Sequence, residues 1–244
     1  MALDDRYALA AIAAQSLAAV LQAAAARLPL TAAQSQSVKR TVFAVSAVMA
    51  PAITAATDVA AIGTVLATAA ATIRGAAAAT DVAPVLYNAA TASFQATPTF
   101  SSPARTQQAA LARMLAECLE AAWLGQAFVS EAQTDFGDRQ AAIAARARIA
   151  GAMDTSLDRI AAATGQAVVD VLGSVARTAT THIATVAADL KPIVSVQTAK
   201  SSPSTAIAFA LYGDPSRATE LVARNKVATP LFMPRNIDAL APES

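Results

Sequence analysis

The sequence predicts a mainly α-helical protein, in which an alanine-rich helical bundle is followed by a small C-terminal module of β-α-α-β order. Three observations support this fold class. About 70 of the 244 residues are alanine, which loses no side-chain entropy in a helix. Only 8 glycines and 11 prolines interrupt the chain. In the last fifty residues, short alternating and capped segments replace the long alanine runs.

The composition excludes several classes of protein. Hydrophobic residues make up 55% of the chain and the net charge is +1, unlike the composition of disordered proteins. A single cysteine, Cys118, cannot form a disulfide within the chain. Only 14% of the residues are charged, against about a quarter in a typical soluble domain, so the polar surface is thin. The balanced charge gives no long-range reason to expect nucleic acid as a specific partner.

Three stretches without charged side chains raise the question of membrane insertion: 7–26, 41–57 and 59–73. Alanine, threonine, serine and glutamine dominate them, which favours buried or self-associating helices over membrane spans. Asp4 and Asp5 stand where a secretory signal has basic residues, so we expect a protein made in the cytoplasm and not secreted. A membrane-perturbing protein that uses these stretches is an alternative hypothesis.

The first predicted domain covers residues 1–95. We predict three helices in it, over residues 5–27, 32–51 and 56–74. The segment Leu28-Pro29-Leu30-Thr31 ends the first helix, and Pro51 kinks or ends the second because its ring removes a backbone donor. The next break is expected over residues 75–84. The proline-rich loop 96–103 is the predicted boundary with the rest of the chain.

An antiparallel helical bundle is predicted over residues 104–190, where apolar side chains recur in steps of three and four. Its three stripes are Leu111, Leu115, Cys118 and Ala122; Met153, Leu157, Ile160 and Thr164; and Val168, Leu172, Val175, Ile183, Val186 and Leu190. Asp138 is expected to cap the helix that follows the turn 134–138. Small alanine side chains allow these helices to pack closely on each other or on neighbouring subunits.

The third predicted domain covers residues 192–242. Residues 193–198 alternate in character and predict a strand, and residues 236–242 predict a second extended segment. Two helices are expected between them, the first with Ser202 as N-cap and Pro203 in its first turn. Four features complete this module: Gly213 as a left-handed terminator, Asp214 as the next N-cap, Asn225 as a left-handed end, and a small core of Leu211, Leu221, Val222 and Ile237.

The string that begins at Tyr212 resembles the second half of a LysM-type module. Such modules combine a Y-G-D/N corner, a helix that ends in A-x-N, a proline-bearing loop and a strand that closes in L-x-P. These features fall here on Tyr212, Gly213, Asp214, Ala223, Asn225, Pro230, Leu240 and Pro242. The resemblance implies a LysM-like βααβ module. Because LysM modules can bind peptidoglycan, a glycan-binding protein is a further alternative.

The longer string IAFALYGDPSRATELVARNKVATPLFMP is more closely similar to the C-terminal end of the DNA circularisation protein family of Mu-like tailed phages. A weaker similarity extends back to about Thr106, whereas Arg235-Asn236 stand where the family has a glycine-rich turn. The resemblance implies a structural protein of the virion tail, at the baseplate hub or tube–baseplate junction, assembled in the host cytoplasm. Other tail and baseplate proteins and further copies of the chain would be its partners. Candidate docking residues are Tyr212, Gly213, Asp214, Arg217, Asn225 and Phe232.

The sequence predicts neither an enzyme nor a metal or cofactor site. His182 is the only histidine, and with Cys118 it cannot supply the three or four clustered ligands of a metal centre. Nucleotide-binding glycine motifs and the G-x-S-x-G turn of hydrolases are absent. Asp135 and Asp138 are expected to be solvated caps rather than parts of a cation loop.

Two further groups of residues have alternative interpretations. Arg139, Arg146 and Arg148 predict a solvated helix face, with contact to a partner or nucleic acid as the less favoured interpretation. Trp123 and Phe128 are expected to lie in the core, and the alternative is an anchor at an interface.

Overall fold

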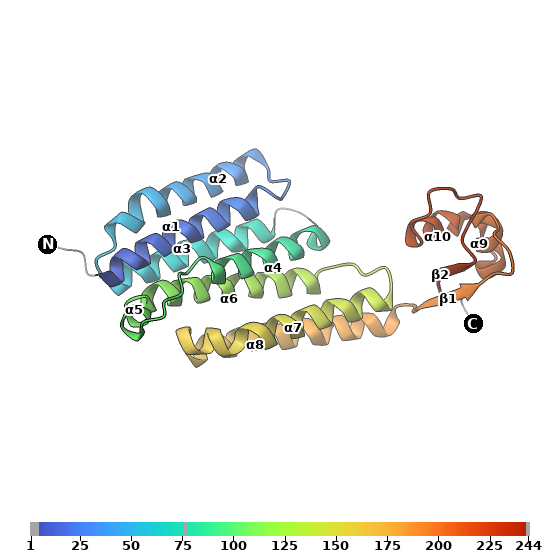
Figure 1. Cartoon of the computed structure of the whole chain (residues 1–244). Coiled ribbons are helices and arrows are strands. Elements are labelled where there is room, and N and C mark those ends of the chain that lie inside the picture. Colours follow the sequence, from blue (N-terminus) through green and yellow to red (C-terminus); the bar gives the residue numbers. More distant parts are fainter. Residues whose placement is uncertain (1–4, 76–77, 243–244) are drawn as a thin grey trace. The chain divides into compact units, whose positions relative to one another are not determined.

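The computed structural model describes residues 5–75 and 78–242 (Figure 1). These residues form ten α-helices and one antiparallel sheet of two strands, so the prediction of a mainly α-helical protein is confirmed. The chain divides into two compact units. The first consists of Met1–Asp135 and Arg146–His182, and the second of Phe136–Ala145 and Ile183–Ser244. The division therefore does not follow the predicted boundary at residues 96–103.

The first unit contains the long helices of the chain. They are α1 (Asp5–Ala25), α2 (Ala32–Phe43), α3 (Ala56–Arg74), α4 (Ala79–Gln95), α5 (Pro103–Gln108), α6 (Ala110–Ala132), and parts of α7 (Arg139–Thr164) and α8 (Gln166–Asp189). A π-helix, Ala44–Met49, and a 3₁₀ turn, Ala50–Ala52, lie between α2 and α3.

Polar side chains near the starts of two helices bind backbone groups that lack helical partners. The Gln34 N–H donates to Thr31 Oγ1 at 3.2 Å, and the Thr31 N–H donates to Gln34 Oε1 at 2.9 Å, which forms a capping box. Asp58 Oδ2 accepts the N–H groups of Thr54 and Ala55, both at 2.9 Å. These two bonds lower the pKa of Asp58. The breaks before α2 and α3 therefore follow from local sequence.

Proline changes the helices at two positions differently from the prediction. The helix predicted over residues 32–51 keeps α-geometry only to Phe43, and the Ala50 N–H then bonds Val45 O in the π-helix before Pro51. Pro51 cannot donate a hydrogen bond, so the chain changes its winding as it approaches this residue. The break predicted over residues 75–84 is shorter than expected. Helix α4 begins at Ala79 and contains Pro84.

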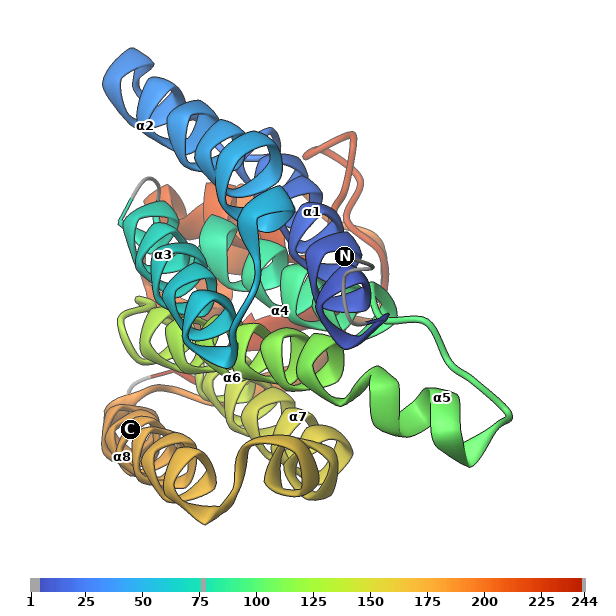
Figure 2. The ribbon, with the colours of Figure 1, turned by 90° about the vertical axis from the view of Figure 1, so that its left-hand side faces the viewer.

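Helix α6 is the central helix of the first unit. It packs against α1, α3 and α4 on one side, and α7 and α8 lie on the other (Figure 2). Because α6 shares its core with the first four helices, residues 1–95 do not form a separate unit from it. Its buried side chains include Leu115, Leu119, Trp123, Leu124 and Phe128, which confirms the predicted core positions of the two aromatic residues.

Two helices of the described chain, α1 and α3, are long and apolar enough to cross a membrane by length and composition alone. In their most apolar windows, 39% and 33% of the residues are buried inside the structure. The third uncharged stretch, 41–57, is not one continuous helix, because it passes through the π-helix and the 3₁₀ turn.

The second unit contains the C-terminal module, in which a strand, two helices and a second strand follow each other. Its elements are β1 (Ile193–Gln197), α9 (Ser204–Tyr212), the 3₁₀ turn Pro215–Arg217, α10 (Ala218–Arg224) and β2 (Asn236–Leu240). The strands pair antiparallel, with Ile193 opposite Leu240 and Gln197 opposite Asn236.

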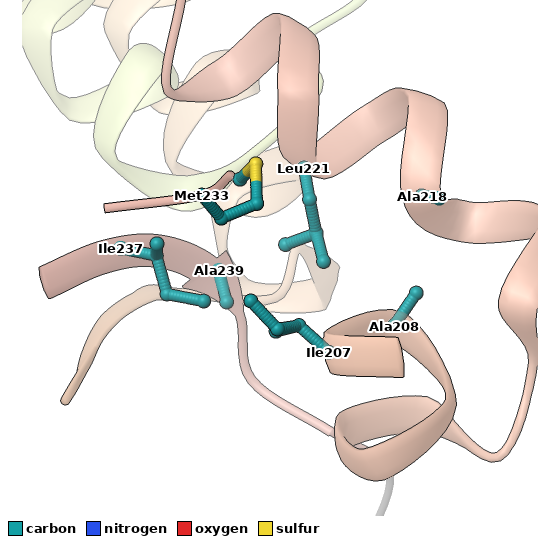
Figure 3. Close-up of a cluster of buried hydrophobic side chains, with 7 residues drawn as sticks. All are labelled: Ile207, Ala208, Ala218, Leu221, Met233, Ile237 and Ala239. Atoms are coloured by element: carbon teal, nitrogen blue, oxygen red, sulfur yellow. The ribbon is translucent and has the colours of Figure 1, made fainter. Parts of the chain in front are cut away.

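The core of this module lies between its two helices and its sheet (Figure 3). It consists of Ile207, Ala208, Ala218, Leu221, Met233, Ile237 and Ala239. Leu221 and Ile237 were predicted for this core, whereas Leu211 and Val222 are only partly buried at its edge. Met233 completes the core from the loop before β2.

Replacement of Phe128 by alanine is expected to lower the free energy of unfolding by about 3–5 kcal/mol, because a fully buried ring leaves a cavity. Urea unfolding followed by the fluorescence of Trp123, the single tryptophan, measures the effect. The matched control is Phe43→Ala on α2, where the side chain is 65% exposed. This control should stay within about 0.5 kcal/mol of the wild type. Equal losses in the two variants would contradict the assigned core.

Candidate functional site

The corner between α9 and α10 is built as the sequence predicts. Gly213 has φ 70°, and its N–H donates to Phe209 O at 2.8 Å. Asp214 Oδ1 accepts the Ser216 N–H at 2.8 Å, and the Ser216 hydroxyl donates to Asp214 Oδ2 at 2.9 Å. These bonds lower the pKa of Asp214. Glycine therefore allows the chain to reverse, and the aspartate starts the next turn.

One predicted N-cap and one predicted left-handed residue are each displaced by one position, although α10 ends at Asn225 as predicted. Pro203 is the N-cap residue of α9, which begins at Ser204, so Ser202 does not cap the helix. Ser202 O instead accepts the Met233 N–H at 3.1 Å. Asn225 has φ −89°, and the positive φ of 51° belongs to Lys226. The side chain of Asn225 has another role, described below.

Arg217 joins Tyr212 to Glu220. Its Cζ atom lies 3.7 Å from the centroid of the Tyr212 ring, which is the distance of a cation–π contact. Its Nε and Nη2 atoms donate to Glu220 Oε2 at 3.0 and 2.7 Å. The bonded carboxylate raises the pKa of Arg217. The guanidinium is therefore held between an aromatic face and a carboxylate, and its charge is largely balanced within the module.

Asn225 joins α10 to β2. Its Nδ2 atom donates to Leu221 O at 2.8 Å and to Asp238 O at 2.9 Å. Its Oδ1 atom accepts the Asp238 N–H at 2.8 Å. One side chain thus satisfies both backbone groups of a residue on the edge of a two-stranded sheet. An amide suits this position better than an acid, because only the amide can donate to carbonyl oxygens and also accept an N–H.

The start of α7 belongs to the same unit and is bonded to the module. Asp138 Oδ1 accepts the Ala141 N–H at 2.8 Å, which confirms the predicted cap. Its other oxygen pairs with Arg224 Nη1 at 2.9 Å. The side chain of Gln140 bonds both backbone groups of Ile193, at 2.8 and 3.1 Å. These contacts hold β1 and α10 against the turn before α7.

Three large apolar side chains of this module are exposed. Phe232 is 70% exposed, and Phe209 and Leu231 are each 63% exposed. The loop that carries Leu231 and Phe232 is held at both ends, since the Ser204 N–H donates to Pro230 O at 2.8 Å and Met233 is buried. We name Phe209, Leu231 and Phe232 the exposed apolar residues of the module. Their backbone is ordered by bonds and by core packing, although their side chains face solvent.

The six predicted docking residues therefore divide into two groups. Tyr212, Gly213, Asp214, Arg217 and Asn225 hold the module together. Phe232 alone offers a large uncovered apolar side chain. Sequence reasoning did not single out Phe209 and Leu231, because the candidate docking residues came from the resemblance, in which only Phe232 of these three was marked. The available signal was helix α9 itself, STAIAFALY, which is apolar on all its faces.

A buried charge cluster in the first unit was also missed. Glu117 and Glu120 on α6 are buried and pair with Arg159 on α7 at 3.3 and 2.5 Å. The Arg159 guanidinium also lies 3.9 Å from the ring centroid of Phe94 on α4. Burial, followed by the neighbouring Glu120, raises the pKa of Glu117 to about 7. Two carboxylates thus share one cation in the interior.

Glu131, which is buried, forms a second pair between the same two helices with Arg148, whose side chain is 52% exposed. Arg148 Nε and Nη2 donate to the two oxygens of Glu131 at 2.7 and 2.9 Å. Arg139 is occupied differently, because its Nε atom donates to Ala187 O and Leu190 O, both at 3.1 Å, at the end of α8. Arg146 and Arg148 are exposed, as expected for a solvated helix face, whereas Arg139 is half-buried. Arg139 and Arg148 in addition have specific partners within the chain.

Within residues 5–75 and 78–242, no group of three His, Cys, Asp or Glu side chains is placed to hold a metal ion. His182 is exposed, and burial raises the pKa of the Cys118 thiol. No family model matches the chain, and no curated protein matches it. The candidate site is the group of exposed apolar residues of the module, Phe209, Leu231 and Phe232.

The variant Glu117→Gln tests the cluster of two acids and one base. Glu117 has a pKa of about 7 when folded, against 4.5 ordinarily, so its contribution to stability is fully present below pH 4.5 and is lost as the pH rises to about 7. The variant keeps the ion pair of Glu120 with Arg159. Its stability does not fall over this pH range, because the glutamine side chain does not titrate. At pH 8 it should exceed the wild type by about 1 kcal/mol or more in urea unfolding.

The control for this variant is Glu131→Gln, which removes the single carboxylate partner of Arg148. It should be less stable than the wild type at pH 8, because a pair with balanced charge has been broken. Loss of stability in Glu117→Gln at pH 8 would contradict an excess of acid in the first cluster.

Replacement of Asn225 by alanine should weaken the module by about 1–3 kcal/mol, because the backbone groups of Asp238 lose their partners. Hydrogen–deuterium exchange of the amides in residues 236–240 measures this loss, with faster exchange expected in the variant. Asn88→Ala, an exposed change on α4, is the matched control and should leave these amides unchanged. Unchanged exchange in Asn225→Ala would remove the assigned role of the amide.

Proposed function

We propose that the protein is a structural component of a contractile phage tail, at the baseplate hub or the tube–baseplate junction, and that it holds neighbouring subunits together. The resemblance of residues 207–234 to the C-terminal end of the DNA circularisation protein family supports this role. The order strand, helix, helix, strand in residues 193–240 is the order expected of a LysM-like module.

The main support for the proposal is the position of the exposed apolar residues of the module. All three lie within residues 207–234, the string that bears the resemblance. Phe209 and Phe232 are large aromatic side chains on a backbone that bonds and core packing hold in place. Exposed aromatic residues on ordered backbone are typical anchors of protein interfaces, because little conformational entropy is lost when a partner covers them. The module therefore serves as a docking unit.

The helical part supports the same function. Only 14% of the chain is charged, and large apolar side chains such as Ile12, Phe43 and Val48 are exposed on its helices. Subunits inside a large assembly cover such faces with other protein, whereas a monomer leaves them in water. The net charge of +1 gives no basic surface for DNA, so we do not include DNA circularisation in the proposed role.

The double variant Phe209→Ser/Phe232→Ser tests the docking surface. The full chain is co-expressed with the tube and baseplate proteins of a contractile phage tail, and co-elution in size-exclusion chromatography is measured. We expect the double variant to bind about tenfold more weakly or worse, since it lacks two aromatic anchors. Ile143→Ser, at an exposed apolar site on α7 outside the string that bears the resemblance, should bind like the wild type.

The result that would overturn the proposed function is a chain that binds none of these proteins. A matching assay on purified sacculi separates the glycan-binding alternative. Retention of the wild-type chain on sacculi, with loss in the double variant, would replace the tail role by peptidoglycan binding.

A further inference from the structure

Helix α7 is held to α6 by ion pairs at two places, and these places differ in how their charge is balanced. In the first half of α7, Arg148 bonds both carboxylate oxygens of the single acid Glu131. In the second half, Arg159 pairs with both Glu117 and Glu120, which lie three residues apart on one face of α6. With both acids ionised, the second place has one negative charge more than α7 balances.

One proton would remove this excess charge. Glu117 and Glu120 are 1% and 4% exposed, and within the described chain the Oε2 atom of each is buried without a hydrogen-bond partner. The two carboxyl groups lie within hydrogen-bond reach of each other, so a protonated Glu117 can donate to Glu120. Burial, this hydrogen bond and the charge of Glu120 raise the pKa of Glu117 to about 7. A shared proton therefore neutralises one acid and pairs two buried oxygens.

The helices around α6 bring no further charge to this place. Helix α4 contributes the uncharged ring of Phe94, which lies on the guanidinium of Arg159. The other charged or titratable groups are exposed or stand at helix ends: Asp5 and Arg6 on α1, Asp58 and Arg74 on α3, Asp81 on α4, Arg105 on α5, Arg113 on α6, Asp154 and Asp158 on α7, and Asp170, Arg177, His182 and Asp189 on α8. On α6 the Cys118 thiol is next to Glu117 in sequence, and burial raises its pKa. Among the described residues, Glu120 and Arg159 are therefore the charged groups that act on Glu117.

Between the two places, α7 contains a segment that bends easily. Gly151 lies in the interior of the helix, where glycine is less favourable than alanine. A Cβ atom added there would meet no neighbouring atom within 4 Å, so packing does not require a glycine. The hydroxyls of Thr155 and Ser156 donate to Gly151 O and Ala152 O, both at 2.7 Å, and such bonds favour bending of a helix. The second half of α7 can therefore move while Arg148 holds the first half.

We propose that the contact of residues 152–164 with α6 is a proton-operated latch, closed while Glu117 and Glu120 share a proton and released when that proton passes to solvent. In the closed state, the Glu117 hydroxyl donates to Glu120, and Arg159 pairs with both side chains. Loss of the proton leaves two buried negative charges beside one cation, and water can hydrate both only when α7 moves away. The Arg159 side chain is 27% exposed, so solvent reaches this contact. The latch does not depend on the proposed function.

Hydrogen–deuterium exchange of the full chain at pH 6 and pH 8, corrected for intrinsic exchange rates, tests the latch. Glu117 has a pKa of about 7 in the closed state and takes its ordinary value of 4.5 in the open state, so opening is about tenfold more favourable at pH 8 than at pH 6. Protection of residues 156–164 should fall about tenfold, whereas residues 146–150 should keep theirs. In Glu117→Gln, protection of residues 156–164 should be equal at the two pH values.

Glu131→Gln is the matched control, because it removes an acid from the same helix at the other place. It should keep the tenfold fall in residues 156–164. A carbon NMR titration of the Glu117 carboxyl group is a second measurement, with a midpoint near 7 expected and a midpoint near 4.5 contradicting the latch. Equal protection of residues 156–164 at both pH values in the wild type would overturn the proposal. So would an equal fall in residues 146–150, or a fall that persists in Glu117→Gln.

Discussion

The burial of most of the surface of α6, including its acidic side chains, is the constraint on which the first unit depends. This helix carries Glu117, Glu120 and Glu131 into the interior, each less than 5% exposed. Burying a carboxylate without a partner costs several kcal/mol of stability. Helix α7 must therefore place its cations beside these carboxylates along the helix axis. Arg148 and Arg159 are eleven residues apart on α7, as Glu131 and Glu120 are on α6. Eleven residues make about three helical turns, so both pairs form only in one register of the antiparallel helices.

Helix α4 adds an aromatic side chain to each of these pairs. Phe94 covers the guanidinium of Arg159, and Tyr87 packs on Phe128 with ring centroids 6.3 Å apart. Burial and the nearby Glu131 raise the pKa of Tyr87, which keeps its hydroxyl protonated beside the second pair. At each of the two pairs, α6 contributes the acid, α7 the base and α4 an aromatic ring. The two pairs differ in net charge, because two acids face the one base Arg159, whereas a single acid faces Arg148.

Local chemistry made much of the fold predictable from sequence. Asp138, Gly213 and Asp214 act through neighbours within three or four residues, and the structure places them in the predicted roles. The pair of Arg159 with Glu120 joins residues 39 positions apart, and no local pattern indicates it. The burial of the acids of α6 was not predicted, because periodicity reports one apolar stripe and does not show that the opposite face is also covered. The same limitation hid Phe209, whose apolar character predicts burial without saying by which chain.

The side chains of α6 divide by size. Large residues such as Leu119, Trp123 and Phe128 fill the interior of the unit. The smaller residues Cys118, Ala122 and Gly125 follow one stripe of the helix and are only half-buried. Alanine-rich composition therefore has two consequences in one helix: it stabilises the helix itself, because alanine loses no side-chain entropy on helix formation, and it leaves one face whose side chains are too small to protrude.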